Sequence, residues 1–342
     1  SFSAHPSVIA TEDGFHDRRL INFSIRTSQF SRNPLRWVKG WDNALKVYEF
    51  DEQFKLVELS EHLVSGTFFP HDFSVTPNYY VFVQNPIRFN VVSYFFGLKG
   101  PAECMKSNPN QTTKLVLIPR NKGKIQYLEL PCHLLCFHHA NSFEENGCLY
   151  IDAVCYKQMP SFQTLTNLTD CIEKPTGELW RFEVDLSRKS VSTERIYTSG
   201  CEFPRVNPRV VGKKHRYVYM CSVDQNHSSS PPQVVVKYEA ATKKQQKWSF
   251  APWGFIGEPL FIPHPQAERE DHGWIIVLVY NSQKHRSEIT VFDAKDITRG
   301  PTARLKLKHH IPYGLHGSFS NDYFGPSQLS ASTEPDIAYL NN

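Results

Sequence analysis

The sequence lacks the features that mark most nucleic-acid-binding and membrane-spanning proteins. The net charge is only +4, from 38 Lys and Arg against 34 Asp and Glu, and no long basic block occurs. No apolar run approaches the roughly 18 residues that a spanning helix requires. The lysines form short groups such as Lys243-Lys244, which are more typical of solvated strand edges. We therefore expect no nucleic-acid partner and no transmembrane helix.

Disulfide and zinc-finger patterns are missing as well. None of the eight cysteines forms a C-x-x-C pair or shows zinc-finger spacing. Several lie in apolar stretches such as Leu135-Cys136-Phe137, where a reduced cysteine behaves as a small hydrophobic residue. We predict free, buried thiols in a reducing compartment. Four Asn-x-Ser/Thr triplets would suit a secreted protein instead, although such triplets are common by chance.

The start of the chain has no initiator methionine and no secretory apolar segment. A sequence motif begins within five residues of Ser1. We therefore expect the natural N-terminus, with any targeting signal, to precede this residue.

Amphipathic helices are nearly absent, and short strands dominate the pattern. Ala44–Phe50 and Glu178–Val184 alternate apolar and polar residues, as half-buried strands do. Other segments rich in β-branched or aromatic residues are Tyr79–Gln84, Lys114–Ile118, Ile125–Leu130, Cys148–Val154, Tyr217–Ser222, Val234–Tyr238, Trp274–Tyr280 and Glu288–Phe292. Many short strands without βαβ alternation predict a barrel, sandwich or propeller. No WD or kelch repeat selects among these three.

Three polar stretches are predicted to lie outside the strands. Pro160–Pro175 and Gln225–Pro232 have the composition of surface loops. The C-terminal tail Ser327–Asn342 is polar, and we expect it to be partly disordered.

One apolar segment, flanked by Arg88 and Lys99, departs from the strand pattern. It could be a buried strand or short helix, or an exposed patch that enters a membrane with the two cations near lipid headgroups. Its large apolar residues are Phe89, Val91, Val92, Tyr94, Phe95, Phe96 and Leu98.

Four of the fifteen histidines share an unusual setting rich in Pro, Gly or aromatic residues at predicted strand ends. They are His5, His71, His138 and His316. Their separations of 66, 67 and 178 residues exclude local metal motifs such as H-E-x-x-H. A propeller or barrel can nevertheless bring distant strand ends together. Because a histidine on an apolar strand is more often an ordinary core residue, the residues alone leave a metal site as a hypothesis.

The segments around these histidines resemble the carotenoid cleavage oxygenase family. Phe69-Pro70-His71-Asp72-Phe73 is similar to the family's His-Asp-Phe strand, and Phe137–Gly147 is similar to its F-H-x-x-N-x-[FYW]-E motif. Gly257–Pro263, followed by Glu270–Trp274, is similar to its Glu-Pro strand and acidic turn. The resemblance runs from residue 3 to about residue 326.

The resemblance implies an all-β fold, a seven-bladed β-propeller with a dome of loops and helices over the metal axis. Residues 1–326 would form this propeller without its N-terminal blade material, and residues 327–342 would be the tail. The implied ligands of Fe(II) are His5, His71, His138 and His316. Glu202 and Glu258 would orient His138 and His316, since a carboxylate that accepts the second imidazole N–H fixes the ring and strengthens it as a donor. A third such glutamate, behind His71, would lie before Ser1.

The implied reaction is the addition of O2 across a conjugated C=C bond of a carotenoid or apocarotenoid, which gives two carbonyl products. Four neutral imidazoles leave open positions on the metal for O2, and no organic cofactor is needed. Family members draw substrate from membranes through an apolar patch, so the resemblance favours membrane contact by the segment Phe89–Leu98. We accordingly expect an intracellular protein, in the plastid or cytoplasm, associated peripherally with a membrane.

Several alternatives stay open at the level of sequence. A stilbene-cleaving oxygenase or a retinoid-type isomerohydrolase would share the same metal site. The segments Leu117–Arg120 and Ile311–Gly317 are closest in character to plant, algal or microbial cleavage enzymes. A non-catalytic propeller that binds carotenoids or a protein is a further alternative, although the presence of all four histidines counts against it. Zinc in the four-histidine site would give a centre that does not activate O2.

Overall fold

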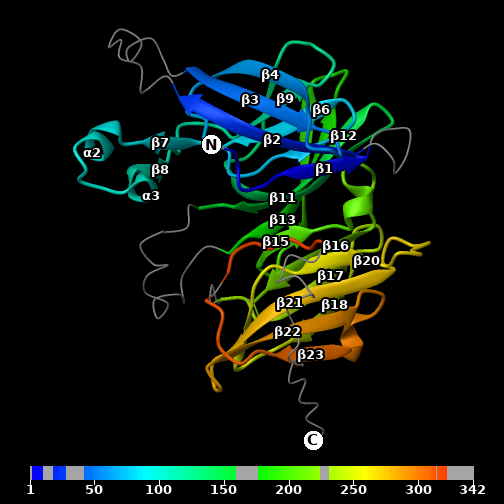
Figure 1. Ribbon diagram of the computed structural model, residues 1–342. Coiled ribbons are helices and arrows are strands. Elements are labelled where there is room, and N and C mark those ends of the chain that lie inside the picture. Colours follow the sequence, from blue (N-terminus) through cyan, green and yellow to red (C-terminus); the bar gives the residue numbers. More distant parts are fainter. Residues whose placement is uncertain are drawn as a thin grey trace, which may run out of the picture.

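The computed structural model describes residues 2–10, 18–27, 42–158, 176–223, 231–312 and 314–321, and these residues are mainly β-strand (Figure 1). The first two sheets contain strands from the N-terminal part of the chain. The first sheet has the order β1-β2-β3-β4, with β1 Ser7–Ala10, β2 Arg18–Thr27, β3 Asp42–Phe50 and β4 Leu56–Ser65. The second has the order β10-β9-β6-β5, with β5 Ser74–Val75, β6 Tyr79–Gln84, β9 Lys114–Pro119 and β10 Gln126–Glu129.

Three more sheets follow in chain order. The third consists of β11 Leu135–Glu145, β12 Cys148–Tyr156, β13 Glu178–Asp185 and β14 Ser190–Tyr197. The fourth consists of β15 Cys201–Arg205, β16 Tyr217–Ser222, β17 Val234–Glu239 and β18 Lys244–Ser249. In the fifth, β19 Gly254–Ile256 and β20 Leu260–Pro263 both pair with β21 Gly273–Asn281, and β22 Arg286–Asp293 and β23 Ala303–Lys306 follow.

Successive sheets pack face to face, and the core is divided into the layers between them. In β6, Val81 and Val83 join the layer toward the third sheet, whereas Tyr80 and Phe82 join the layer toward the first. This split follows from the two-residue period of a strand, which places alternate side chains on opposite faces. Similar layers join the third sheet to the fourth and the fourth to the fifth.

Repeated four-stranded antiparallel sheets that pack face to face are the blades of a β-propeller. The prediction of an all-β propeller is therefore confirmed, and the described residues form five blades. The predicted loop Pro160–Pro175 and the tail Ser327–Asn342 lie entirely, and the predicted loop Gln225–Pro232 mostly, outside the described residues. The division into a unit at 1–326 and a tail at 327–342 thus stays a prediction.

The second blade contains an excursion that leaves the body of the molecule between β6 and β9 (Figure 1). It consists of the strand pair β7 Ile87–Phe89 and β8 Met105–Ser107, with the short helices α2 Val91–Phe95 and α3 Pro101–Cys104 between them. The Asn90 side chain caps α2 by accepting a hydrogen bond from the Ser93 amide at 3.0 Å. No helix in the described part of the chain is long and apolar enough to cross a membrane.

The excursion contains the apolar segment flanked by Arg88 and Lys99, for which the sequence allowed either a buried element or an exposed patch. Val92, Phe95, Phe96 and Leu98 are 66, 72, 69 and 72% exposed, respectively. The buried alternative is therefore wrong for these four side chains. Phe89 is half-buried and Tyr94 is exposed, while the side chain of Val91 lies outside the described part.

Candidate metal centre

The four histidines singled out in the sequence meet at one point, although they come from different blades and loops. His5 precedes β1, His71 precedes β5, His138 lies within β11 and His316 follows β23. Their ring centroids are 4.4 to 6.4 Å apart, with the shortest distance between His5 and His316. One potential ligand atom from each ring lies within 4.8 Å of all the others.

The spacing of the nitrogen atoms suits a single metal ion. Imidazole nitrogens bind a divalent metal at about 2.1 Å, so neighbouring donors at right angles are roughly 3 Å apart. Nε2 of His5 and Nε2 of His71 are separated by 3.1 Å. Nε2 of His138 is buried without a hydrogen-bond partner in the described part of the chain. A buried nitrogen of this kind is costly unless something binds it, and a metal ion would do so.

The electrostatics favour neutral imidazoles, the form that binds metals, at His5 and His71. Burial lowers the pKa of His5 to about 4. The nearby Asp72 raises this pKa, whereas the three other histidines of the cluster lower it further. Burial and the neighbouring His138 likewise lower the pKa of His71.

Strand β11 directs its two adjacent histidines to opposite sides. His138 and His139 pair in regular register with Val154 and Ala153, and successive residues of a strand point to opposite faces. His138 enters the cluster, whereas His139 Nδ1 lies 2.9 Å from the Ser74 hydroxyl. His139 therefore points away from the cluster.

Glu202 forms a hydrogen bond with His138, the histidine that the resemblance assigned to it. Its carboxylate accepts hydrogen bonds from His138 Nδ1 at 2.6 Å, from the Tyr156 hydroxyl and from the Phe203 amide at 2.8 Å. Burial by itself would raise the pKa of Glu202, but His138 and these donors lower it. Burial alone would also lower the pKa of His138, and the Glu202 carboxylate raises it instead. The ionised carboxylate holds the proton on Nδ1 and leaves Nε2 directed at the centre of the cluster.

Glu258 supports His316, but it is shared with a cation. Its Oε1 lies 3.3 Å from His316 Nδ1 and accepts a hydrogen bond from Arg205 Nε at 2.7 Å. Its Oε2 accepts from the Gly317 amide at 3.0 Å. Glu258 therefore orients His316 and also binds the neighbouring arginine. For His71, no hydrogen bond to a carboxylate occurs among the described residues, and the expected third glutamate stays a prediction.

Two residues of the centre were missed in the sequence. The Phe203 ring lies 5.3 Å from the His138 ring and 5.2 Å from the His316 ring. Its backbone has φ +52°, a left-handed conformation that is unusual for a residue with a side chain. Tyr156 contacts Glu202 from β12, the strand beside the one that bears His138. Tyr156 lies outside the histidine and carboxylate motifs, so no local signal identified it, whereas Phe203 directly follows Glu202 and could have been found from that position.

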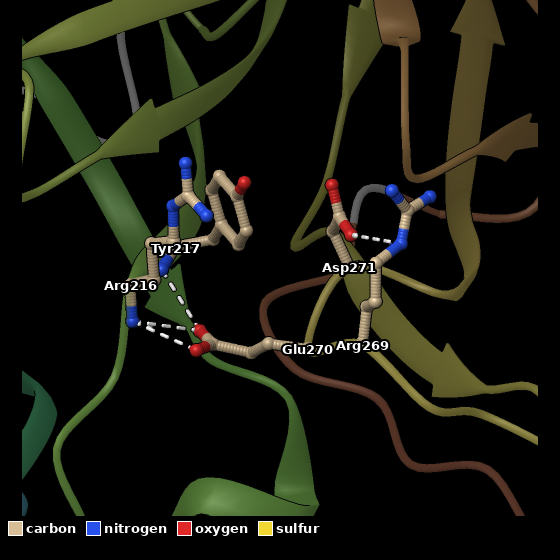
Figure 2. A pocket seen from close by; sticks show the side chains of 5 residues that line it. All are labelled: Arg216, Tyr217, Arg269, Glu270 and Asp271. Carbon is tan, nitrogen blue, oxygen red and sulfur yellow. Dashed lines mark hydrogen bonds and ion pairs between the residues drawn. The ribbon is translucent and has the colours of Figure 1, made fainter.

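A separate cavity of about 400 Å³ lies between the start of β16 and the turn before β21 (Figure 2). Four of its five lining residues are charged. Glu270 accepts hydrogen bonds from the backbone N–H groups of Arg216 and Tyr217, and Asp271 contacts Lys237 Nζ at 2.9 Å. These paired charges join the fourth blade to the fifth and do not suit a long apolar ligand. The acidic turn of the sequence motif is therefore part of a structural link in this fold.

The chain is similar to known proteins in both sequence and fold. The family model described as retinal pigment epithelial membrane protein matches residues 1–321. The chain is 38% identical over 322 residues to the apocarotenoid-15,15'-oxygenase of Synechocystis sp., and the match covers 93% of this chain and 63% of that protein. It is 28% identical over 315 residues to human beta,beta-carotene 15,15'-dioxygenase, covering 80% of this chain and 56% of the human protein.

The fold matches a solved structure of the same cyanobacterial enzyme. The cobalt-substituted Synechocystis enzyme aligns with a TM-score of 0.85 at 37% identity, covering 93% of this chain and 64% of the other. The chain thus spans less than two thirds of the length of these relatives.

Proposed function

This chain belongs to the family of the retinal pigment epithelial membrane protein and the carotenoid cleavage oxygenases, and we propose that its protein is an Fe(II)-dependent dioxygenase that cleaves a carotenoid or apocarotenoid. The proposed reaction splits one conjugated C=C bond with O2 and gives two carbonyl products. The observation that carries this proposal is the convergence of His5, His71, His138 and His316, with one ligand atom from each within 4.8 Å of the others.

The residues of the centre fit an iron ion and define what the protein contributes. We propose that the four imidazoles hold the ion, and bound iron would supply the activation of O2. Glu202 and Glu258 fix the orientation of the His138 and His316 rings through Nδ1. All four proposed ligands are uncharged donors, unlike those of a 2-His-1-carboxylate site. The negative charge that compensates the charge of the metal therefore lies on these glutamates, which contact the ligands instead of the metal.

The relatives indicate a class of substrate for this protein. One acts on an apocarotenoid and another on beta,beta-carotene, and both substrates are apolar conjugated polyenes. We propose a substrate of this class for the present protein. The stilbene-cleaving and isomerohydrolase alternatives share the metal site, so a product assay on carotenoids, apocarotenoids, stilbenes and retinyl esters separates them.

Peripheral membrane contact is proposed for the excursion of the second blade. Val92, Phe95, Phe96 and Leu98 present exposed apolar side chains, and the exposed Arg88 and Lys99 flank them. An apolar patch beside cations suits the boundary between acyl chains and anionic headgroups. Such contact would give the protein access to substrates dissolved in the bilayer.

The function is tested by measuring iron content together with cleavage products. The wild-type protein should hold stoichiometric iron and cleave a polyene, and His138→Ala should lose both. His62→Ala provides the control, because His62 is a half-buried histidine on β4, outside the cluster. Cleavage by a wild-type protein that contains no iron would contradict the proposal.

A further inference from the structure

The two glutamates of the metal centre differ in their remaining partners. Glu258 uses Oε1 for both His316 and the cationic Arg205. Glu202 instead accepts a hydrogen bond from the neutral hydroxyl of Tyr156 at Oε1, and its Oε2 contacts His138. The distance from carboxylate oxygen to imidazole Nδ1 is 2.6 Å at His138 and 3.3 Å at His316.

This difference has a chemical consequence for the imidazoles. A guanidinium partly cancels the charge of the carboxylate that it contacts, so less negative charge is left to attract the Nδ1 proton. A hydroxyl fixes the carboxylate without adding a formal charge. The His138 imidazole is thereby expected to be the stronger electron donor through Nε2.

Tyr156 is well placed to hold Glu202 still. It is 9% exposed and lies in β12, where it pairs with Leu135 of β11, the strand that bears His138. Its ring packs edge-on against Phe137 with the centroids 5.6 Å apart. Because the ring is fixed by this packing, the direction of the hydroxyl group toward Glu202 is fixed as well.

We propose that Tyr156 is a positioning residue of the metal centre, which holds Glu202 in the orientation that receives the His138 Nδ1 proton. This inference rests on the proposed function, because it assumes that His138 binds the metal through Nε2. Without the hydroxyl, Glu202 Oε1 loses this donor and the carboxylate can rotate away from His138.

The test compares metal retention in Tyr156→Phe and Tyr197→Phe. Tyr197 is the matched control, because it is buried in the same apolar layer and its hydroxyl lies 3.3 Å from the Ser222 hydroxyl, not from a carboxylate. We expect Tyr156→Phe to release Fe(II) to a chelator about tenfold faster than wild type, the lower end of the effect of losing an outer partner of a metal ligand. The visible absorption bands of the Co(II)-loaded variant should shift. Tyr197→Phe should match wild type in both measurements.

A double-mutant cycle with Glu202→Gln separates positioning from packing. If Tyr156 acts through the carboxylate, Tyr156→Phe should add little to the metal loss of Glu202→Gln. A purely structural role would instead lower the melting temperature of the metal-free protein and leave the release rate and Co(II) spectrum unchanged.

The possible failures are distinguishable. A wild-type protein that holds no iron contradicts the proposed function. A wild-type protein that holds iron, with Tyr156→Phe releasing it at the wild-type rate, contradicts only the role of Tyr156. An equal effect of Tyr197→Phe would also overturn this role, because the hydroxyl on Glu202 would then have no special importance.

Discussion

At the scale of single residues, the metal centre combines neutral donors with charged supports. Burial keeps His5 and His71 neutral, whereas His138 is paired with an ionised glutamate. A metal ion competes with protons for these imidazoles, so metal binding and stability should both depend on pH.

Acidification should destabilise the metal-free protein through His5 and His71. Their folded-state pKa values lie below the usual 6.5, with that of His5 at about 4, so below pH 6.5 the unfolded chain binds more protons than the folded one. Their contribution to stability is full above about pH 6.5 and is lost as the pH falls toward 4. The melting temperature measured from pH 7.5 to 4.5 should therefore drop, and His5→Gln should show a smaller drop over this window. An equal drop in the variant would contradict this assignment to His5.

The residues that the sequence identified at this scale are those with recognisable chemistry in a motif. The four histidines and the two glutamates were placed by their flanking residues. Tyr156 was not, because an aromatic residue in a strand has the same local signature whether it packs in the core or beside a metal centre, and Phe203 was overlooked although it directly follows Glu202.

At the scale of elements, the position of a strand within its blade decides whether its sequence pattern allows the strand to be predicted. The middle strands of the blades have buried faces and were mostly predicted, but the inner strands β1, β5, β11 and β15 were not. The outer strands β14 and β18 were missed, because their exposed positions bear polar residues such as those of Lys244–Lys247. A solvent-exposed edge strand has little apolar alternation to detect.

The excursion that contains α2 should mediate binding to lipid. Replacing Phe95 and Phe96 by Asp puts two charges on the exposed apolar surface, so binding to anionic liposomes should fall by at least tenfold, about 1.4 kcal/mol, since each buried aromatic contributes roughly 1.5–3 kcal/mol. Cosedimentation with vesicles measures this, and Phe54→Asp is the control, because Phe54 is 75% exposed in a different turn. Unchanged binding of the double variant would rule out membrane contact by this patch.

At the scale of the whole molecule, stability comes from the apolar layers between successive blades. Phe182 is completely buried in the layer between the second and third blades. Phe182→Ala should reduce the free energy of unfolding by about 3–5 kcal/mol, because the side chain leaves a cavity that its neighbours fill only in part. Urea denaturation measures the loss. Leu305→Ala on the exposed strand β23 should change it by no more than about 0.5 kcal/mol, and equal effects would contradict this account of the core.

The sequence by itself determined the strand-rich class and, through its motifs, the family, because strand periodicity and motif chemistry are local properties. Only the tertiary structure decided that four histidines separated by 66, 67 and 178 residues meet. The distance in space between residues so far apart in the chain is not fixed until the blades pack around an axis. The tertiary structure also decided that Phe95 and Phe96 are exposed and that Glu202 binds a tyrosine where Glu258 binds an arginine. Burial and partner choice depend on which surfaces come together, and residues far apart in the chain supply those surfaces.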